Sequence, residues 1–167
     1  TKIGFVAFDT ETDSLDATQA TLIGISLATK NGRACYVPLR HNTSNQSSLL
    51  TDGASAIQQI PFDEAIALLK PMLEDPSILK IGHNIKYDAL VVQQTKNGSI
   101  RIKSVDDTMC LSYVLEGGLH GHGLDELSEL HFDHTNIKYK DVCGSGKSQI
   151  SFAEVDVEKA LDYAAED

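Results

Sequence analysis

Cysteine is scarce in this sequence: Cys35, Cys110 and Cys143 are far apart, and no two of them form a Cys-x-x-Cys pair. A disulfide framework is therefore not expected. Apolar runs long enough to span a membrane are also missing, and the N-terminus lacks the basic-then-apolar pattern of a secretory signal. These absences predict an intracellular, cytoplasmic chain without a membrane partner.

Recognisable zinc motifs are absent as well. The six histidines include two close pairs, His120/His122 and His131/His134. Neither pair is accompanied by Cys-x-x-Cys, and neither belongs to a His-Glu-x-x-His sequence, which are the spacings typical of zinc sites. We therefore expect no structural zinc.

Basic residues are in the minority, since 14 Lys and Arg face 24 Asp and Glu and give a formal net charge of −10. Such a chain does not grip nucleic acid by bulk electrostatics, although it can meet phosphates through bound metal ions. A nucleoside triphosphate loop is excluded, because Asp141 replaces the glycine that should precede Gly146-Lys147-Ser148. With 167 residues, 41% of them hydrophobic, we expect one domain spanning 1–167.

The apolar periodicity predicts an α/β chain with a mixed sheet. The expected strands are 3–8, 21–29, 33–39 and 78–82, with a hairpin at Asn31-Gly32. The expected helices are 63–73, a helix from the N-cap Asn84 to Asn97-Gly98, 106–115, 124–131, and a helix from the capping box at Ser151 to Asp167. Residues 40–60 are expected to form a surface loop.

The first strand runs into a polar stretch that carries two carboxylates, Asp9 and Glu11. Side chains alternate along a strand, so both should project from the same face. Two carboxylates about 4 Å apart repel by about 4 kcal/mol at a surface-like dielectric, and a shared proton or a divalent cation can offset this. A solvated strand end without a role is the alternative. A calcium loop is excluded, because its sixth and twelfth positions are Ser14 and Ala20.

Three segments together form a more specific pattern. FDTETDSLD (8–16), HNIKYDALV (83–91) and YAAED (163–167) resemble, in order and spacing, the three motifs of the 3′-5′ proofreading domains of bacterial DNA polymerase I. The third segment resembles the tyrosine variant of the Asp-Glu-Asp-Asp exonucleases, and the resemblance covers essentially the whole chain. It implies a ribonuclease H-like three-layer fold with a central mixed β-sheet flanked by helices.

The resemblance also implies a two-metal-ion site. Asp9, Glu11 and Asp167 would hold one divalent cation, Mg²⁺ or Mn²⁺. Asp9 would bridge to a second cation supported by Asp88, and Tyr163 would orient the attacking water. The chemistry requires the same residue types, because two divalent ions activate water and clamp a phosphodiester, and hard oxygen ligands suit Mg²⁺ and Mn²⁺. Considered alone, Asp88 could be a helix-capping acid and Tyr163 a packed helix residue.

The expected DNA-binding residues follow from the same resemblance. Thr12 and Leu15 would contact the terminal nucleotide, Leu15 by wedging between bases. Asn84 matches the residue with which the family contacts the DNA strand. His83 stands at a position where the family commonly has Gln. Tyr139 would stack on a single-stranded base, which is worth about 1–3 kcal/mol. A core or surface tyrosine is the alternative for Tyr139.

The activity implied is hydrolysis of the single-stranded 3′ end of DNA with release of 5′ mononucleotides. The expected setting is a nucleoid-associated protein whose polymerase domain lies outside this chain. Two alternatives remain open at this point. One is an RNA-trimming enzyme similar to ribonuclease D, and the other is an inactive module that only binds strands.

Overall fold

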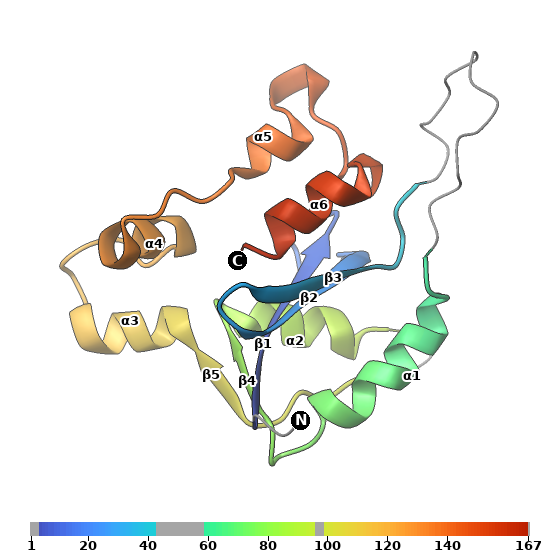
Figure 1. Ribbon diagram of the computed structural model, residues 1–167, viewed down its shortest axis with the longest axis horizontal. Coiled ribbons are helices and arrows are strands. Elements are labelled where there is room, and N and C mark those ends of the chain that lie inside the picture. Colours follow the sequence, from blue (N-terminus) through green and yellow to red (C-terminus); the bar gives the residue numbers. More distant parts are fainter. Residues whose placement is uncertain (1–3, 43–58, 96–98, 167) are drawn as a thin grey trace.

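The computed structural model describes residues 4–42, 59–95 and 99–166, and its centre is a mixed β-sheet (Figure 1). Within these ranges five strands pair in the order β3-β2-β1-β4-β5. Their bounds are β1 Phe5–Thr12, β2 Leu22–Lys30, β3 Arg33–Pro38, β4 Leu79–Gly82 and β5 Val105–Asp107. The central strand β1 is antiparallel to β2 and parallel to β4.

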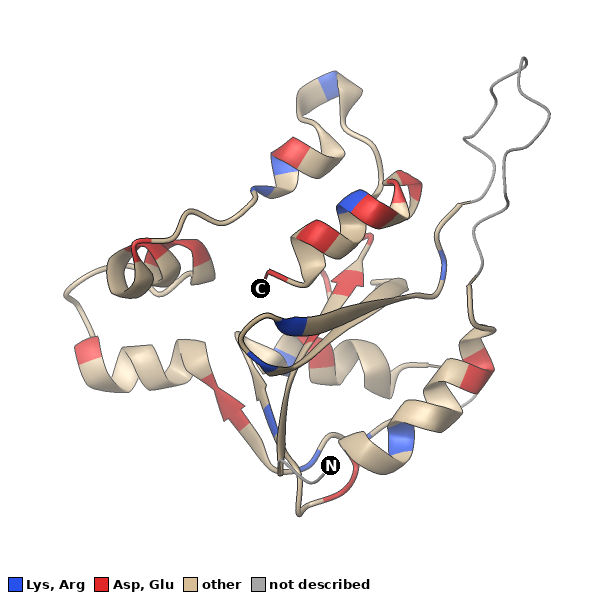
Figure 2. Cartoon of the chain, viewed as in Figure 1, with Lys and Arg blue, Asp and Glu red and all other residues tan. Residues whose placement is uncertain are grey.

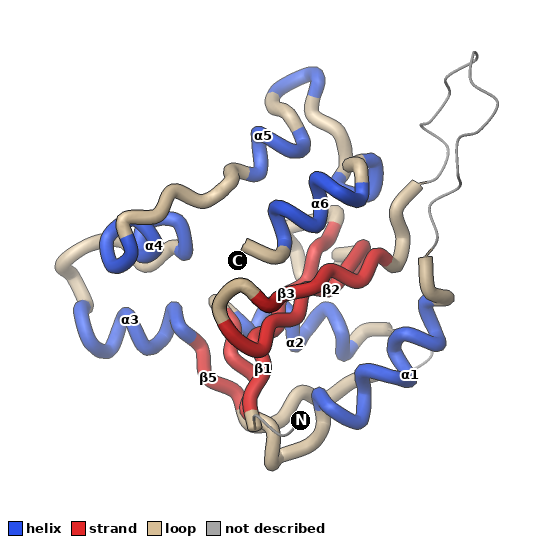
Figure 3. Tube along the Cα trace, viewed as in Figure 1, coloured by secondary structure: helices blue, strands red, loops and turns tan. Residues whose placement is uncertain are grey.

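Helices lie on both faces of this sheet and at one edge of it (Figure 3). The α-helices are α1 Phe62–Leu73, α2 Ile85–Gln93, α3 Thr108–Glu116, α4 Leu124–Phe132, α5 Tyr139–Cys143 and α6 Val157–Ala164. Two short 3₁₀ helices, η2 Gly146–Ser148 and η3 Phe152–Glu154, precede α6. None of the helices in the described ranges combines the length and apolarity that a bilayer crossing requires.

Two buried clusters define the layers. Phe8 of β1 packs with Ile66 of α1 and Val92 of α2 on one face of the sheet. On the other face, Ile23 of β2 packs with Phe152 of η3 and with residues of α5 and α6. The predicted three-layer fold with a central mixed sheet is therefore confirmed.

The hairpin and the length of β1 show how pairing sets the strand ends. Lys30 pairs with Arg33, so Asn31-Gly32 forms the predicted two-residue turn, with Gly32 at a φ of 70°. Strand β1 extends four residues beyond the predicted apolar run. Thr10 and Glu11 continue the ladder with β2, so the acidic stretch is itself part of the central strand.

The C-terminal helix differs from the prediction. The capping box between Ser151 and Glu154 is present, but it starts only η3. The chain is extended at Val155, and the Asp156 side chain then accepts hydrogen bonds from the backbone N–H groups of Glu158 and Lys159 to begin α6. A second N-cap thus divides the segment into two helices.

Two short elements of the structure, β5 and α5, were not predicted from the sequence. Three and five residues are too few to show a periodicity. Most of the predicted loop 40–60 and the predicted helix end at Asn97-Gly98 lie outside the described residues.

Candidate active site

A cavity of about 700 Å³ opens at the carboxyl end of β1. Its walls come from three distant parts of the chain, and they include every predicted site residue that the structure describes. These residues are Asp9, Glu11, Thr12, Leu15, His83, Asn84, Asp88, Tyr139 and Tyr163. The remaining predicted ligand, Asp167, lies outside the described residues.

The alternation of β1 distributes its side chains between the two helical layers. Asp9 lines a hollow together with Ala164 of α6, and Glu11 lies within electrostatic range of Tyr139 of α5. Thr10 faces the opposite layer, where its backbone N–H and its hydroxyl donate to Asp88 Oδ1 at 3.1 and 2.5 Å. The central strand therefore brings carboxylates from both layers to one end of the sheet.

Asp88 is the most buried of these acids, with 2% of its surface exposed. Burial raises the pKa of Asp88 from its ordinary value to about 6, and the two hydrogen bonds from Thr10 act in the opposite direction. The carboxylate is therefore ionised at neutral pH at a cost to the folded state. A cation beside it would remove that cost, because an opposite charge favours the ionised form.

Replacing Thr10 by valine tests this support. The variant loses the hydroxyl that donates to Asp88, and a hydrogen bond to a charged group is worth about 1.5–3 kcal/mol. We expect urea denaturation at pH 8 to show a loss of unfolding free energy of that size. The matched control is Thr29→Val on β2, because the buried Thr29 hydroxyl has no hydrogen-bond partner among the described residues. Equal losses in the two variants would contradict the role of Thr10.

Glu11 is also buried, and its negative charge makes the ionisable side chains around it harder to deprotonate. Burial is the main cause that raises the pKa values of Tyr36, Tyr139 and Cys143, and the negative charge of Glu11 raises each of them further. Tyr36 comes this close because Gly24 pairs with Glu11 in the neighbouring strand. A Cβ atom on Gly24 would lie 2.0 Å from the Tyr36 hydroxyl oxygen.

Tyr87 holds the loop that follows β1 and was not singled out in the sequence. Its hydroxyl shares a 2.5 Å hydrogen bond with Thr12 Oγ1 and donates to the backbone oxygen of Ser14. Leu15, which follows at once, is 99% exposed. A loop anchored by these hydrogen bonds, with an exposed apolar tip, suits the predicted wedge between bases. The only sequence signal for Tyr87 was its place beside Asp88 in the second motif.

His83 and Asn84 are fixed by the start of α3. The His83 Nδ1 atom lies 2.9 Å from the Thr108 hydroxyl oxygen, and burial lowers the pKa of this imidazole below its ordinary value. Asn84 occupies the N-cap position of α2 as predicted, in a left-handed conformation with a φ of 59°, but its side chain makes no capping hydrogen bond. Its backbone N–H donates instead to Asp107 Oδ1, the atom that caps α3.

The two aromatic residues of the site pack against a common partner. The rings of Tyr139 and Tyr163 lie 6.4 and 5.8 Å from the Phe152 ring. Tyr139 is also 39% exposed and faces the cavity. It therefore has both a packing role and a ring surface accessible to a ligand.

The charge of the cavity suits cations. Its described lining includes the carboxylates Asp9, Glu11, Asp13 and Asp88 and no Lys or Arg. Figure 2 shows basic residues on and around α5, and none of them belongs to the described lining of the cavity. A phosphodiester entering this cavity would be repelled unless cations were bound, and a set of carboxylate oxygens is the donor set that Mg²⁺ and Mn²⁺ prefer. The residues present therefore fit divalent cations.

Comparisons with known proteins give one family for the whole chain. A family model described as 3′-5′ exonuclease matches residues 1–167. DNA polymerase I of Rhizobium leguminosarum is 49% identical over 98% of this chain, and DNA polymerase I of Pseudomonas aeruginosa is 39% identical over 97%. The chain spans 16% and 17% of the length of these two relatives.

Solved structures share the fold. Brucella melitensis NrnC superimposes with a TM-score of 0.67 at 23% identity, over 98% of this chain and 66% of that one. Escherichia coli RNase D, an exoribonuclease, gives a TM-score of 0.63 at 19% identity, over 98% of this chain and 36% of that one. At such identities the likeness establishes the ribonuclease H-like architecture, in agreement with the predicted fold class.

Proposed function

Because the chain belongs to the family of 3′-5′ exonuclease domains of DNA polymerase I, we propose that it shortens the single-stranded 3′ end of DNA and releases 5′ mononucleotides. The observation that carries this proposal is the single cavity that gathers residues of all three motifs. Residues 1–167 would form one exonuclease domain that proofreads for a polymerase domain of the same natural protein, at the nucleoid of the cytoplasm.

Asp9, Glu11, Asp88 and Asp167 are the proposed metal ligands. When bound, two divalent cations would supply an activated water and charge stabilisation at the scissile phosphate. The chain fixes the positions of three of these carboxylates, since Asp9 and Glu11 belong to the central strand and Asp88 is held by Thr10. Mg²⁺ and Mn²⁺ both suit this oxygen donor set.

The remaining side chains would position the substrate. Tyr163 is a weak base, so its hydroxyl would orient the attacking water rather than take its proton. Leu15, in the loop that Tyr87 holds, would separate the terminal bases, and Thr12, the last residue of β1, would contact the last nucleotide. His83 and Asn84, which follow the end of β4, would face the bound DNA strand.

Tyr139 provides a test of substrate binding. Replacing it by leucine keeps apolar bulk against Phe152 but removes the ring face. Base stacking is worth about 1–3 kcal/mol, so single-strand affinity should fall about 5- to 150-fold when it is measured by fluorescence anisotropy with Ca²⁺ in place of Mg²⁺, which keeps cations beside the carboxylates. The turnover rate at saturating substrate should change much less. Tyr139→Phe keeps the ring and should retain the affinity, and an unchanged affinity in Tyr139→Leu would rule out stacking.

Matched DNA and RNA oligonucleotides with single-stranded 3′ tails test the activity itself. We expect stepwise shortening of the DNA tail with Mg²⁺ or Mn²⁺ and none with EDTA. A strong preference for the RNA tail would favour an RNA-trimming function like that of ribonuclease D, with which the chain shares its fold. Binding without shortening of either tail would indicate an inactive strand-binding module.

A further inference from the structure

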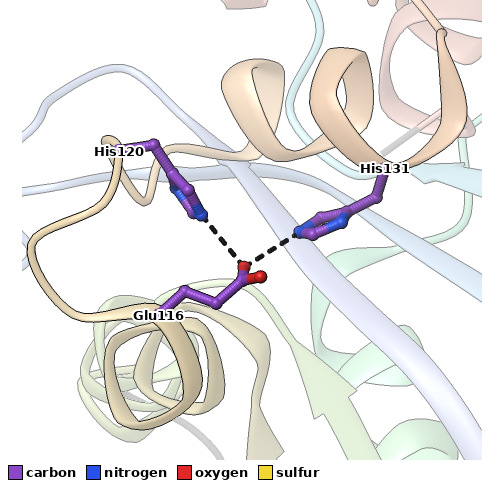
Figure 4. Close-up of side chains that lie close together, drawn as sticks. All are labelled: Glu116, His120 and His131. Carbon is purple, nitrogen blue, oxygen red and sulfur yellow. Dashed lines mark hydrogen bonds and ion pairs between the residues drawn. The ribbon is translucent and has the colours of Figure 1, made fainter.

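A second cluster of metal-ligating side chains lies outside the carboxylate cavity. Glu116, the last residue of α3, His120 in the following loop and His131 of α4 place one ligand atom each within 4.8 Å of one another. Figure 4 shows the two imidazole rings converging on one carboxylate oxygen. The Nε2 atoms of His120 and His131 lie 2.9 and 3.4 Å from Glu116 Oε2.

Two of the three separations in this cluster are close to those within a zinc site. Zinc binds histidine nitrogen and carboxylate oxygen at about 2.0–2.2 Å, so ligand atoms in a tetrahedral site are about 3.4 Å apart. The two distances to Glu116 Oε2 are 3.4 and 2.9 Å, and the ligand atoms of the two histidines lie within 4.8 Å of each other, so side-chain rotations would bring all three atoms to this spacing. Two histidines and one glutamate form a known set of zinc ligands, which leaves a fourth position for water.

The orientation of His120 is a second, independent observation. Its Nδ1 atom lies 2.6 Å from the backbone oxygen of Gly121, which can only accept a hydrogen bond. Nδ1 must therefore carry a proton, and in the neutral ring Nε2 presents a lone pair toward the Glu116 carboxylate. Two electron-rich atoms 2.9 Å apart require a positive charge between them, which is a proton on Nε2 in the metal-free chain and a metal ion when one displaces that proton. A histidine that donates Nδ1–H to a carbonyl while Nε2 faces outward is the usual arrangement of a metal ligand.

The histidines that neighbour the cluster in the sequence contact other residues. The cluster therefore does not simply collect every histidine of this region. His122 is buried, and its Nδ1 atom lies 2.7 Å from the Ser112 hydroxyl oxygen. His134 is 2.8 Å from Glu166 near the end of α6. Each close pair in the sequence thus supplies one histidine to the cluster and one to another contact.

The packing around the cluster leaves a stabilising role open. Within the described structure α4 has no buried residue, and α3 buries only Ser112. Large apolar residues on the two helices are exposed instead, among them Val114 and Phe132. A metal ion held by both helices would supply a cross-link that apolar burial does not provide.

We propose that Glu116, His120 and His131 bind a zinc ion that fixes α3 against α4. This differs from the expectation of no zinc, which rested on the absence of contiguous motifs. The ligands come from two helices and the loop between them, so no short motif encodes the site. Fixing α3 would also affect the catalytic cavity. Thr108 at the start of α3 holds His83, which lines that cavity.

Zinc titration of the whole chain tests the proposal in a background with Asp9→Ala and Asp88→Asn, so that the catalytic carboxylates do not compete. We expect one zinc per chain by calorimetry and by metal analysis after dialysis. Zinc at about 100 times its dissociation constant should raise the Tm by about 5–10 °C. Cobalt in place of zinc should give a visible absorption band from the bound ion.

The ligand variants decide the outcome. Loss of partners outside the ligand shell alone weakens metal sites 10–100-fold, so His131→Ala and Glu116→Gln should each weaken zinc binding by more than about 100-fold. The matched control His134→Ala should bind zinc as the parent does. His131 is partly exposed, so its variant should keep the Tm of the zinc-free parent, which separates lost binding from lost folding. Zinc binding that is absent in the parent or unchanged in His131→Ala would overturn the proposal, whatever the outcome of the exonuclease assay.

Discussion

Asp9→Ala is expected to lower the rate of nucleotide release from a 3′-tailed oligonucleotide by about 10³-fold or more. Asp9 is the proposed bridging ligand, and metal ions supply several kcal/mol of charge stabilisation to such reactions. A loss of about 4 kcal/mol corresponds to about 10³ in rate. Single-turnover hydrolysis at saturating Mg²⁺ measures the effect directly.

The fold should survive this change, because β1 is held by ladders on both sides and the substitution removes one of several mutually repelling acids. Far-ultraviolet circular dichroism and the metal-free Tm should therefore remain close to those of the parent. Asp63→Ala, an exposed acid in the first turn of α1, is the matched control and should keep full activity. Turnover by Asp9→Ala at the rate of this control would contradict the assigned site.

Asp88→Asn should have opposite effects on activity and on stability. Asparagine keeps an oxygen that can accept from Thr10, but it removes the charge that would support the proposed second metal ion. Changes around metal ligands typically cost 10–100-fold, so we expect a fall in hydrolysis rate of at least about that size. In EDTA at pH 8, however, the unfolding free energy should rise by about 2–3 kcal/mol, since a tenfold change in a proton-binding constant corresponds to about 1.4 kcal/mol.

Proton linkage sets the sign of this stability change. Burial raises the pKa of Asp88 from 3.8 in its ordinary state to about 6 in the folded protein, so between these values the folded state binds the proton more tightly. The contribution of Asp88 to the stability of the metal-free parent should therefore fall as the pH rises from about 4 to about 6 and level off above that range. Asp88→Asn lacks this decline, so the difference between the two proteins should be small at pH 4 and largest at pH 8.

Asp16→Asn supplies the contrasting case. The hydroxyl and the backbone N–H of Thr18 both donate hydrogen bonds to Asp16. These bonds, the one from the hydroxyl most of all, lower the pKa of this exposed carboxyl. Removing its charge should give no stabilisation at pH 8.

Divalent cations should also raise the Tm of the parent more than that of Asp88→Asn, because they offset the charge that the variant lacks. A difference in unfolding free energy between the parent and Asp88→Asn that does not grow from pH 4 to pH 8 in EDTA would contradict the effect of burial on Asp88.

Much of the architecture followed from local patterns in the sequence. The apolar runs marked four of the strands, Asn31-Gly32 marked the hairpin, and three spaced motifs indicated the family and the acids of one site. The strand and hairpin signals are strong because each depends on residues close together in the chain, where periodicity and turn chemistry act directly. The motifs are each short, and their common order along the chain indicated the family. The divided helix after Ser151 shows the limit, since a local cap signal does not determine how far a helix continues.

Contacts between distant residues were decided only by the tertiary structure. Thr10 and Asp88 are 78 positions apart, and nothing near either residue indicates that one donates to the other. The space that Gly24 leaves for Tyr36, and the convergence of Glu116, His120 and His131, likewise depend on how strands and helices pack. The sequence determined which carboxylates and histidines are available, whereas folding determined which of them share a site. Burial and proximity, which set their charge and their ligands, exist only in the packed chain.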